Sequence, residues 1–352
     1  MKAGVEKTMA DVEIGIEGGL GVITLNRPEA INALTREMVE AMSRALSGWK
    51  GEARVKAVLL EGRGERGFCA GGDVRAVRAG IVAGRTEAAL AFFAAEYALN
   101  ALIANYEKPV VALTHGVVMG GGIGLAGHAG FRFTTMASRF AMPEGAIGFV
   151  PDVGVNFILA KAMPERALHF LMTGEPIGPA DAVKLGLTDC VIANDRQAGV
   201  RERIVAAAST GDVETSLTGI MHSEIVETEP AAMAALAERL APAYAQEAAE
   251  DMVAVIAEMA DTDAEIRGVL RVIDKRCPTS VVAAVDSYRA SRSARDIADV
   301  LARDLRLARY MAQRTDFHEG VRAVLVDKDH RPTWSPERIE EVDSQAILEL
   351  VS

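Results

Sequence analysis

Short apolar runs alternate with segments of helical spacing over the first third of the chain. Residues 11–26 contain two apolar runs on either side of Gly18 and Gly19, a pattern that predicts two short strands joined by a turn. Thr35 follows at a position typical of a helix N-cap, and the apolar positions after it recur with helical spacing as far as Ser47. The chain is therefore predicted to begin with a strand pair and a helix.

The alternation of strand and helix patterns continues along the chain. Residues 56–62 form a buried-strand pattern, and the Ala-rich residues 73–81 and 86–105 have helical spacing. Pro109 opens a further apolar strand, and residues 131–135 predict another. Strands that are apolar along nearly their whole length are typical of a sheet covered by helices. The sequence therefore predicts an α/β fold.

The second half of the chain has a different pattern. From about Val155 it consists of short helices separated by Pro and Gly, and residues 195–320 are almost entirely helical in spacing. Ser, Thr and Gly gather over residues 195–215. We place a boundary there, between a core of residues 1–195 and a helical C-terminal region of residues 196–352.

Composition and charge exclude several classes of protein. The 352 residues carry a formal net charge of −11, whereas a nucleic-acid-binding protein needs a basic surface. The cysteines Cys69, Cys190 and Cys277 are scattered and form no CxxC motif or Cys/His cluster. We therefore expect neither a disulfide framework nor a metal site, and a reducing compartment is the simplest interpretation.

No segment predicts targeting or membrane anchoring. Residues 1–19 lack the apolar core of a signal peptide and contain acidic residues, which transit peptides avoid. The most apolar long run, residues 110–127, contains His115 and several glycines and fits a buried strand, turn and helix better than a membrane span. We therefore expect a cytoplasmic protein.

Two glycine-rich loops each follow an apolar strand. The first is FCAGGD at residues 68–73, and the second is MGGGIG at residues 119–124. Glycine lets the backbone approach a ligand closely, and N–H groups at the start of a helix can hold an anion. Together the loops can place two N–H donors on one developing oxyanion. The alternative is that each loop is only a tight turn.

Other familiar motifs receive no support. Residues 122–127 match GxGxxG, but a dinucleotide-binding fold requires a following helix and then a strand that ends in an acidic residue. The next predicted strand begins at Phe131 and ends without an acid. No Gly-x-Ser-x-Gly motif is present, which argues against a serine hydrolase. We expect His115 to be a hydrogen-bonded core residue rather than a catalytic one.

Three carboxylates lie in apolar stretches of sequence. Glu144 and Asp152 belong to the segment AMPEGAIGFVPDVG, and Glu96 belongs to the helix pattern AFFAAEYALNALI. Burial of neighbouring carboxyl groups raises their pKa values and suits them to acid–base or nucleophilic catalysis. The alternatives are that Glu144 is a helix N-terminal acid, that Asp152 is an N-cap, and that Glu96 faces solvent.

At these motifs the chain resembles the enoyl-CoA hydratase/isomerase (crotonase) superfamily, and within it the family of 3-hydroxyisobutyryl-CoA hydrolases. The resemblance covers about residues 12–195 and consists of four blocks in order: ITLNRPEAINAL, GFCAGGDVRAV, KPVVALTHGVVMGGGIGLAGH and FAMPEGAIGFVPDVG. The tail TDFHEGVRAVLVDKDHRPTW also resembles the hydrolases. The resemblance implies an α/β fold, a crotonase-like spiral of ββα units with a helical C-terminal region.

The resemblance also implies roles for individual residues. The N–H groups of Gly72 and Gly121 match the two donors of the superfamily's oxyanion hole. Glu144 matches the glutamate of the Pro-Glu motif. Asp152 matches the aspartate of the hydrolase pattern PDVG, and Glu96 matches the acid that precedes Tyr-x-Leu-Asn.

The chain also departs from its relatives at several positions. Hydratases of the superfamily carry a second catalytic glutamate where this chain has Gly124, which argues against hydratase activity. Val155 and Asn156 stand where the hydrolases often have further glycines, a difference that can reshape the acyl pocket.

The implied reaction is the hydrolysis of an acyl-CoA thioester, specifically of 3-hydroxyisobutyryl-CoA in valine degradation. Gly72 and Gly121 would bind the oxyanion, Glu144 would attack the carbonyl or activate water, and Asp152 and Glu96 would hold the 3-hydroxyl group or the water. The alternatives are another reaction of the superfamily, such as an isomerisation that uses Glu144 alone, and a non-catalytic acyl-CoA binder.

The same resemblance implies the partners of the protein. Coenzyme A is part of the substrate, so no metal and no further cofactor is implied. We expect an acyl-CoA as the small-molecule partner, no nucleic acid and no membrane. Relatives commonly form trimers or pairs of trimers, which makes a trimer-based homo-oligomer the implied assembly.

Overall fold

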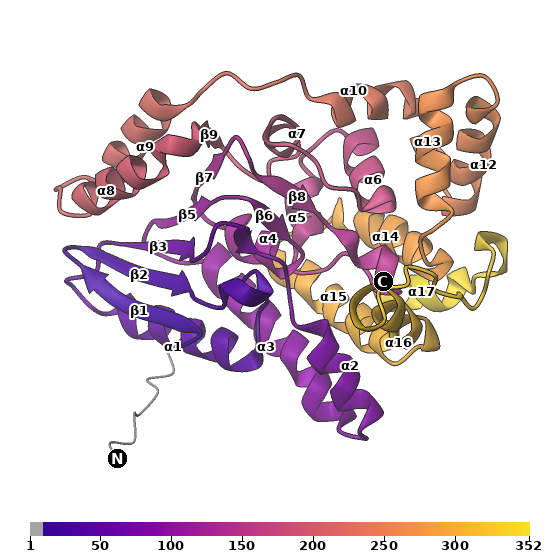
Figure 1. Ribbon diagram of the computed structural model, residues 1–352, viewed down its shortest axis with the longest axis horizontal. Coiled ribbons are helices and arrows are strands. Elements are labelled where there is room, and N and C mark those ends of the chain that lie inside the picture. The colour runs from indigo at the N-terminus through magenta and orange to yellow at the C-terminus, as the bar shows by residue number, and fades with distance from the viewer. Residues whose placement is uncertain (1–9) are drawn as a thin grey trace, which may run out of the picture.

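Two sheets form the framework of the protein in the computed structural model, which describes residues 10–352 (Figure 1). The strands are β1 (Val12–Glu17), β2 (Leu20–Leu25), β3 (Ala57–Gly62), β4 (Gly67–Cys69), β5 (Val110–Thr114), β6 (Val117–Met119), β7 (Phe131–Thr135), β8 (Arg139–Ala141) and β9 (Cys190–Ile192). The larger sheet has the order β1-β2-β3-β5-β7-β9 and is parallel except for the β1–β2 hairpin. The smaller sheet, β4-β6-β8, is parallel throughout. Residues 1–9, for which we expect no leader, lie outside the described residues.

Helices follow the strands and make up almost all of the C-terminal half. The α-helices are α1 (Arg36–Lys50), α2 (Val74–Val82), α3 (Thr86–Ala104), α4 (Gly121–Ala126), α5 (Val155–Leu159), α6 (Pro164–Thr173), α7 (Pro179–Lys184), α8 (Gln197–Ala207), α9 (Val213–Glu224), α10 (Ala232–Arg239), α11 (Ala241–Tyr244), α12 (Ala249–Ala260), α13 (Ala264–Ile273), α14 (Pro278–Ser291), α15 (Ile297–Ala312), α16 (Thr315–Val321) and α17 (Ser344–Val351). Short 3-10 turns are η1 (Pro28–Ala30), η2 (Pro143–Ile147), η3 (Asn194–Arg196) and η5 (Ile339–Glu341), and η4 (Arg322–Val326) is a π-helical turn.

Successive units of the chain add one strand to each sheet and then a helix. β3, β4 and α2 form one such unit, and β5, β6 and α4 form the next. In the third, β7 and β8 lead into η2 and α5. This order confirms the predicted α/β spiral of ββα units, and the helices from α8 onward confirm the helical C-terminal region.

The longer elements lie where the sequence pattern predicts them. Thr35 caps α1 as expected, because its side chain accepts a hydrogen bond of 3.3 Å from the N–H of Met38. The first two residues of the segment FCAGGD, predicted to be a loop, instead belong to β4. The smaller sheet was not predicted at all, since strands of three residues are too short to show a periodicity.

Helix α3 is the one helix of the described residues that is long and apolar enough to span a membrane. It packs against α1, α2 and α15. Its buried face includes Glu96 and Asn100 as well as apolar side chains. The helix is therefore a core helix that carries polar groups into the interior.

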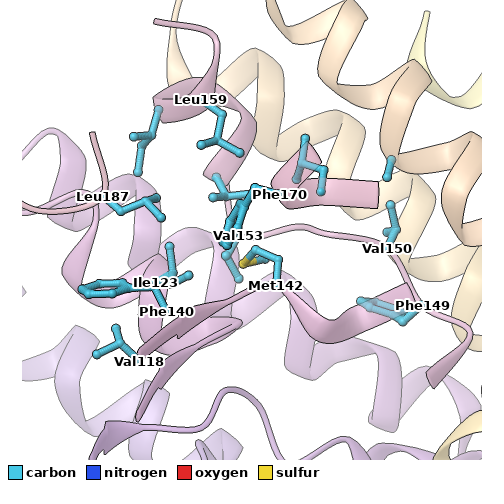
Figure 2. Close-up of a cluster of buried hydrophobic side chains, with 14 of the residues drawn as sticks. Val118, Ile123, Phe140, Met142, Phe149, Val150, Val153, Leu159, Phe170 and Leu187 are labelled. Atoms are coloured by element: carbon cyan, nitrogen blue, oxygen red, sulfur yellow. The ribbon is translucent and has the colours of Figure 1, made fainter. Parts of the chain in front are cut away.

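The main apolar core draws on residues from Val12 to Val351. Figure 2 shows one part of it, where Ile123 of α4, Phe140 of β8 and Phe170 of α6 lie near one another. A second core lies between the larger sheet and the helices α8 and α9. The boundary between residues 195 and 196 stays a prediction, and helices from both sides of it share the main core.

Candidate active site

A cavity of about 350 Å³ lies where the two glycine loops, α3 and the segment 143–152 meet. Its lining is largely apolar, with Phe92 and Phe93 from α3 and Phe149 on the opposite segment. Val324 and Leu325 of η4 close it from the C-terminal region. The cavity contains every site residue that the sequence analysis proposed: Gly72, Glu96, Gly121, Glu144 and Asp152.

The two glycine loops lie directly beside one another. Gly71 has φ +104° and Gly120 has φ +49°, a region that residues with a side chain rarely adopt. A methyl group on Gly71 would lie 3.4 Å from the backbone nitrogen of Gly121. Glycine is thus required here for the backbone conformation, and the two loops lie within contact distance of one another.

The backbone N–H groups of Gly72 and Gly121 are both free of protein acceptors. Leu34 forms a parallel bridge with the residues on either side of Gly72. Its carbonyl accepts the N–H of Asp73, and its N–H donates to the carbonyl of Gly71. The N–H of Gly72 is therefore not used in this bridge. Gly121 is the first residue of α4, where a helical N–H has no partner within the helix. Among the described residues, neither N–H donates a hydrogen bond. The pair can therefore serve as an oxyanion hole.

The three carboxylates of the site are all buried. Their exposed fractions are 2% for Glu96, 4% for Asp152 and 8% for Glu144. Asp152 accepts a hydrogen bond from the hydroxyl of Tyr97. One oxygen each of Glu96 and Glu144 has no partner among the described residues. A buried carboxyl oxygen without a partner is costly, so these atoms are positioned for a ligand or water.

Burial also changes how these carboxylates ionise. It raises the pKa of Glu144 and the pKa of Glu96 well above the ordinary value of a glutamate, and the nearby Asp152 raises both further. Burial raises the pKa of Asp152 to about 7, while the hydrogen bond from Tyr97 acts in the opposite direction. Asp152 can therefore hold and release a proton near neutral pH, as acid–base chemistry requires.

The structure decides between the alternatives for each acid. The solvent-facing interpretation of Glu96 is wrong, because its side chain is buried. The N-cap interpretation of Asp152 is also wrong, since Gly154 precedes α5 and no side chain caps that helix. Glu144 does lie in the first turn of a helix, the 3-10 turn η2, and it also lines the cavity.

The carboxyl groups of Glu96 and Glu144 lie close to the backbone of the second glycine loop. A methyl group on Gly121 would lie 2.2 Å from Oε1 of Glu96, and one on Gly120 would lie 2.8 Å from Oε1 of Glu144. Neither distance is possible for a real side chain. Glycine at both positions therefore leaves room for the carboxylate ends of Glu96 and Glu144 beside the loop.

Gly124 is fully enclosed by its neighbours. A methyl group on it would lie 2.7 Å from Cβ of Val153 and 2.9 Å from Nδ2 of Asn100. The position where superfamily hydratases carry a second glutamate thus has no room for a side chain. The described site contains no acid in its place.

Sequence analysis missed three polar residues that surround the acids. Tyr97 and Asn100 lie on α3 in the stretch EYALN. Asn100 is four residues after Glu96 and three after Tyr97, and this spacing could have indicated a shared helix face. Both polar atoms of the Asn100 side chain are buried and have no partner among the described residues. Asp304, on α15, is also buried, and no local pattern connects it with the site.

Other candidate residues lie elsewhere or are used in structure. His115 does not line the cavity, and its two ring nitrogens contact the carbonyl of Gly64 and the side chain of Gln197. The prediction that His115 makes hydrogen bonds is confirmed, but the prediction that it belongs to the core is wrong, because the residue is only partly buried. Within residues 10–352 no group of His, Cys, Asp and Glu is arranged to hold a metal ion. The three cysteines are free and buried.

Comparisons with known proteins agree with this geometry. The family model described as enoyl-CoA hydratase/isomerase matches residues 20–351. The mitochondrial 3-hydroxyisobutyryl-CoA hydrolase of Gallus gallus is 32% identical, over 96% of this chain and 88% of that protein. The enzyme of the same name from Homo sapiens is also 32% identical, over 94% of this chain and 86% of its own length.

Two solved structures share nearly the whole fold. A carnitinyl-CoA dehydratase from Mycobacterium thermoresistibile has a TM-score of 0.87 and 34% identity, covering 97% of this chain and 96% of its own. An enoyl-CoA hydratase from Rhodobacter sphaeroides 2.4.1 has a TM-score of 0.87 and 30% identity, covering 97% of both chains. The C-terminal helices thus belong to the shared fold.

Proposed function

The chain belongs to the enoyl-CoA hydratase/isomerase family, and we propose that within it this protein hydrolyses acyl-CoA thioesters, with 3-hydroxyisobutyryl-CoA as substrate. The names of its relatives point to different reactions, since the curated relatives are hydrolases and the two solved structures bear the names of a dehydratase and a hydratase. The choice between hydrolysis and hydration therefore depends on the residues of the site itself.

The observation that favours hydrolysis is the packing at Gly124. Addition of water across a double bond needs a second acid–base group on the glycine-loop side. Val153 and Asn100 fill the space that its side chain would require. Thioester hydrolysis requires only an oxyanion hole and one base or nucleophile, and we assign these roles to Gly72 with Gly121 and to Glu144.

In the proposed mechanism the thioester carbonyl oxygen lies between the N–H groups of Gly72 and Gly121. Negative charge develops on that oxygen as the carbonyl carbon becomes tetrahedral, and each donor of this kind typically lowers the barrier by about 2.7–4 kcal/mol. The tetrahedral intermediate then collapses, the C–S bond breaks, and the thiolate of coenzyme A leaves.

Glu144 supplies the attacking group in one of two ways. Its carboxylate either attacks the carbonyl to form an anhydride that water then cleaves, or takes a proton from a water molecule that attacks directly. The raised pKa of Glu144 makes its carboxylate a stronger base in both cases. Asp152 and Glu96 hold the 3-hydroxyl group of the substrate or the water.

Coenzyme A enters this reaction as part of the substrate, and the proposed mechanism uses no further cofactor. Arg75 and Lys328 line the cavity, and their positive charges suit the phosphate groups of coenzyme A. A cytoplasmic location and a trimer-based assembly remain predictions, and the relatives named here as mitochondrial are eukaryotic proteins.

A screen for thiol release tests the proposal. The purified protein is given 3-hydroxyisobutyryl-CoA, isobutyryl-CoA and crotonyl-CoA, while crotonyl-CoA hydration is followed separately, and the Glu144→Gln variant serves as the background control. We expect hydrolysis of the hydroxylated ester to exceed hydration by far more than tenfold. Hydration with a kcat within about tenfold of hydrolysis, a barrier difference of only ~1.4 kcal/mol, would overturn the assignment.

A further inference from the structure

The turn that carries Asp152 has an unusual backbone. Val153 has φ +55° and Gly154 has φ +71°, so two consecutive residues lie in the left-handed region. Glycine adopts this conformation readily, whereas a β-branched valine does so only when its surroundings impose it. Val153 is buried, and Figure 2 shows its side chain among those of the apolar core. Residues 152–154 therefore form a strained turn that other groups must hold.

Three side chains hold this turn, one from α3, one from the turn after α4 and one from α15. The Tyr97 hydroxyl of α3 donates to Asp152, as described above. Nε2 of His128 lies 2.8 Å from the carbonyl oxygen of Val153. Oδ2 of Asp304, on α15, accepts the N–H of Gly154 at 2.8 Å. Each residue of the turn thus contacts one of these side chains, and the three side chains come from different parts of the chain. The carbonyl groups of Asp152 and Gly154 also accept the backbone N–H groups of Val155 and Phe157.

The histidine is neutral in this position. Burial lowers the pKa of His128 to about 4, so the ring carries a single proton at neutral pH. Because a carbonyl oxygen can only accept, that proton is on Nε2 and is donated to Val153. His128 therefore fixes the carbonyl side of the turn and leaves its N–H side to another group.

Asp304 is the group that fixes the N–H side. It is 1% exposed, and its second oxygen has no partner among the described residues. A buried aspartate that makes one backbone hydrogen bond is costly to retain for packing alone. It lies on α15, 150 residues along the chain from Gly154, and it does not line the cavity itself.

We propose that Asp304 is a positioning residue of the thioester-hydrolysing site. By accepting the N–H of Gly154 it keeps the 152–154 turn in its strained conformation, and this keeps the Asp152 carboxyl in the cavity with one oxygen on Tyr97. The C-terminal helical region thereby contributes to catalysis through α15. The inference rests on the proposed function, because the position of Asp152 affects the reaction rate only if the site is catalytic.

Four variants test this role. Asp304→Ala removes the acceptor, and Asp304→Leu removes it while filling a similar volume, so one of the two remains informative if the other does not fold. Asp304→Asn keeps an oxygen that can accept the N–H of Gly154. Asp181→Ala is the matched control, because Asp181 is also buried and accepts the N–H groups of Met233 and Ala234, away from the cavity.

The readouts are kcat, KM and thermal unfolding with 3-hydroxyisobutyryl-CoA. We expect Asp304→Ala and Asp304→Leu to lower kcat by roughly 10- to 100-fold, while KM stays within about threefold of the wild type. The Asp304→Asn variant should have a kcat within about threefold of the wild type. The Asp181→Ala variant should lose stability but keep its kcat.

Other results overturn the inference. A folded Asp304→Leu protein with kcat within threefold of the wild type would show that Asp304 does not position the site. An equal loss of kcat in Asp181→Ala would show that the loss comes from general destabilisation. An Asp304→Asn variant as slow as Asp304→Leu would show that the hydrogen bond to Gly154 does not maintain kcat. If the wild type itself releases no thiol, the proposed function fails and this inference fails with it.

Discussion

Three carboxylates share the cavity, but their hydrogen-bond partners differ. The Tyr97 hydroxyl donates to Asp152, whereas Glu96 and Glu144 each keep an oxygen without a protein partner. A hydrogen bond to a carboxylate stabilises its ionised form, so Asp152 is the first of the three to lose its proton as pH rises. Because their ionisation differs, we expect Asp152, Glu96 and Glu144 to have different roles although they line the same cavity.

The first prediction separates Glu144 from Asp152 by substrate. Glu144 acts on the thioester carbonyl, which every acyl-CoA shares, so Glu144→Gln should lose about three orders of magnitude or more in kcat/KM on every ester. Asp152→Asn should mainly narrow the preference for 3-hydroxyisobutyryl-CoA over isobutyryl-CoA, because a group that binds a hydroxyl discriminates against analogues without it. Both esters are measured on the wild type and on both variants. An equal loss on both esters in Asp152→Asn would place Asp152 in water activation instead.

The second prediction concerns stability and pH. The pKa of Asp152 rises from an ordinary 3.8 to about 7 on folding, so between these values the folded state binds more protons than the unfolded state. The contribution of Asp152 to stability is therefore present below about pH 4 and is lost as pH rises towards 7. Relative to Asp152→Asn, which cannot ionise, the wild type should lose unfolding free energy over this window by on the order of 1 kcal/mol per pH unit.

Denaturant unfolding of both proteins at several pH values measures this difference. Asp195→Asn, in the exposed turn η3, is the control substitution and should show no comparable trend. A difference between the wild type and Asp152→Asn that stays constant with pH would contradict the assigned shift.

At the scale of elements, sequence and structure agree best where a pattern is long. Helix α1 and strand β7 could be predicted because each shows a period or an unbroken apolar run. Strands β4, β6 and β8 could not, because they form through pairing between segments roughly 20–50 residues apart, such as Gly67 with Val117.

The burial of Glu96 illustrates the same limit. Helix α3 is apolar around most of its circumference, so its sequence does not indicate which face is buried. The packing of α1, α2 and α15 around it places Glu96 inside. The two glycine loops and the Pro-Glu segment could be predicted because their motifs are contiguous, whereas Asp304 reaches the site only through tertiary packing.

The third prediction tests the start of α4 as half of the oxyanion hole. Proline fits the first position of a helix but has no N–H, so Gly121→Pro removes the proposed donor. Any side chain at this position also displaces the Glu96 carboxyl, which Gly121→Ala reproduces while keeping the N–H. We expect kcat of the alanine variant to exceed that of the proline variant by about 10²–10³. Equal kcat values in the two folded variants would show that the oxyanion is bound elsewhere.

At the scale of the whole molecule, the C-terminal helices complete both the core and the site. Helix α14 packs on α5 and α6, and α15 packs on α3. Val324 and Leu325 line the cavity, and Asp304 contacts the turn behind Asp152. Because this region supplies both apolar packing and polar contacts, we expect it to fold together with residues 1–195.

The last prediction follows from this shared core. A chain that ends after residue 195 loses α14, α15 and α17, and leaves exposed the apolar side chains that those helices cover. Since apolar burial is the main favourable term in folding, this fragment should be unfolded or aggregated, whereas the full chain should unfold in one cooperative transition. Circular dichroism, gel filtration and calorimetry measure these properties.

Co-expression of residues 1–195 with residues 196–352 is the control, and it should recover soluble protein and thioesterase activity if the missing packing is the only defect. A soluble 1–195 fragment with its own cooperative transition would instead show that the spiral folds independently and that the C-terminal helices were added to a stable core.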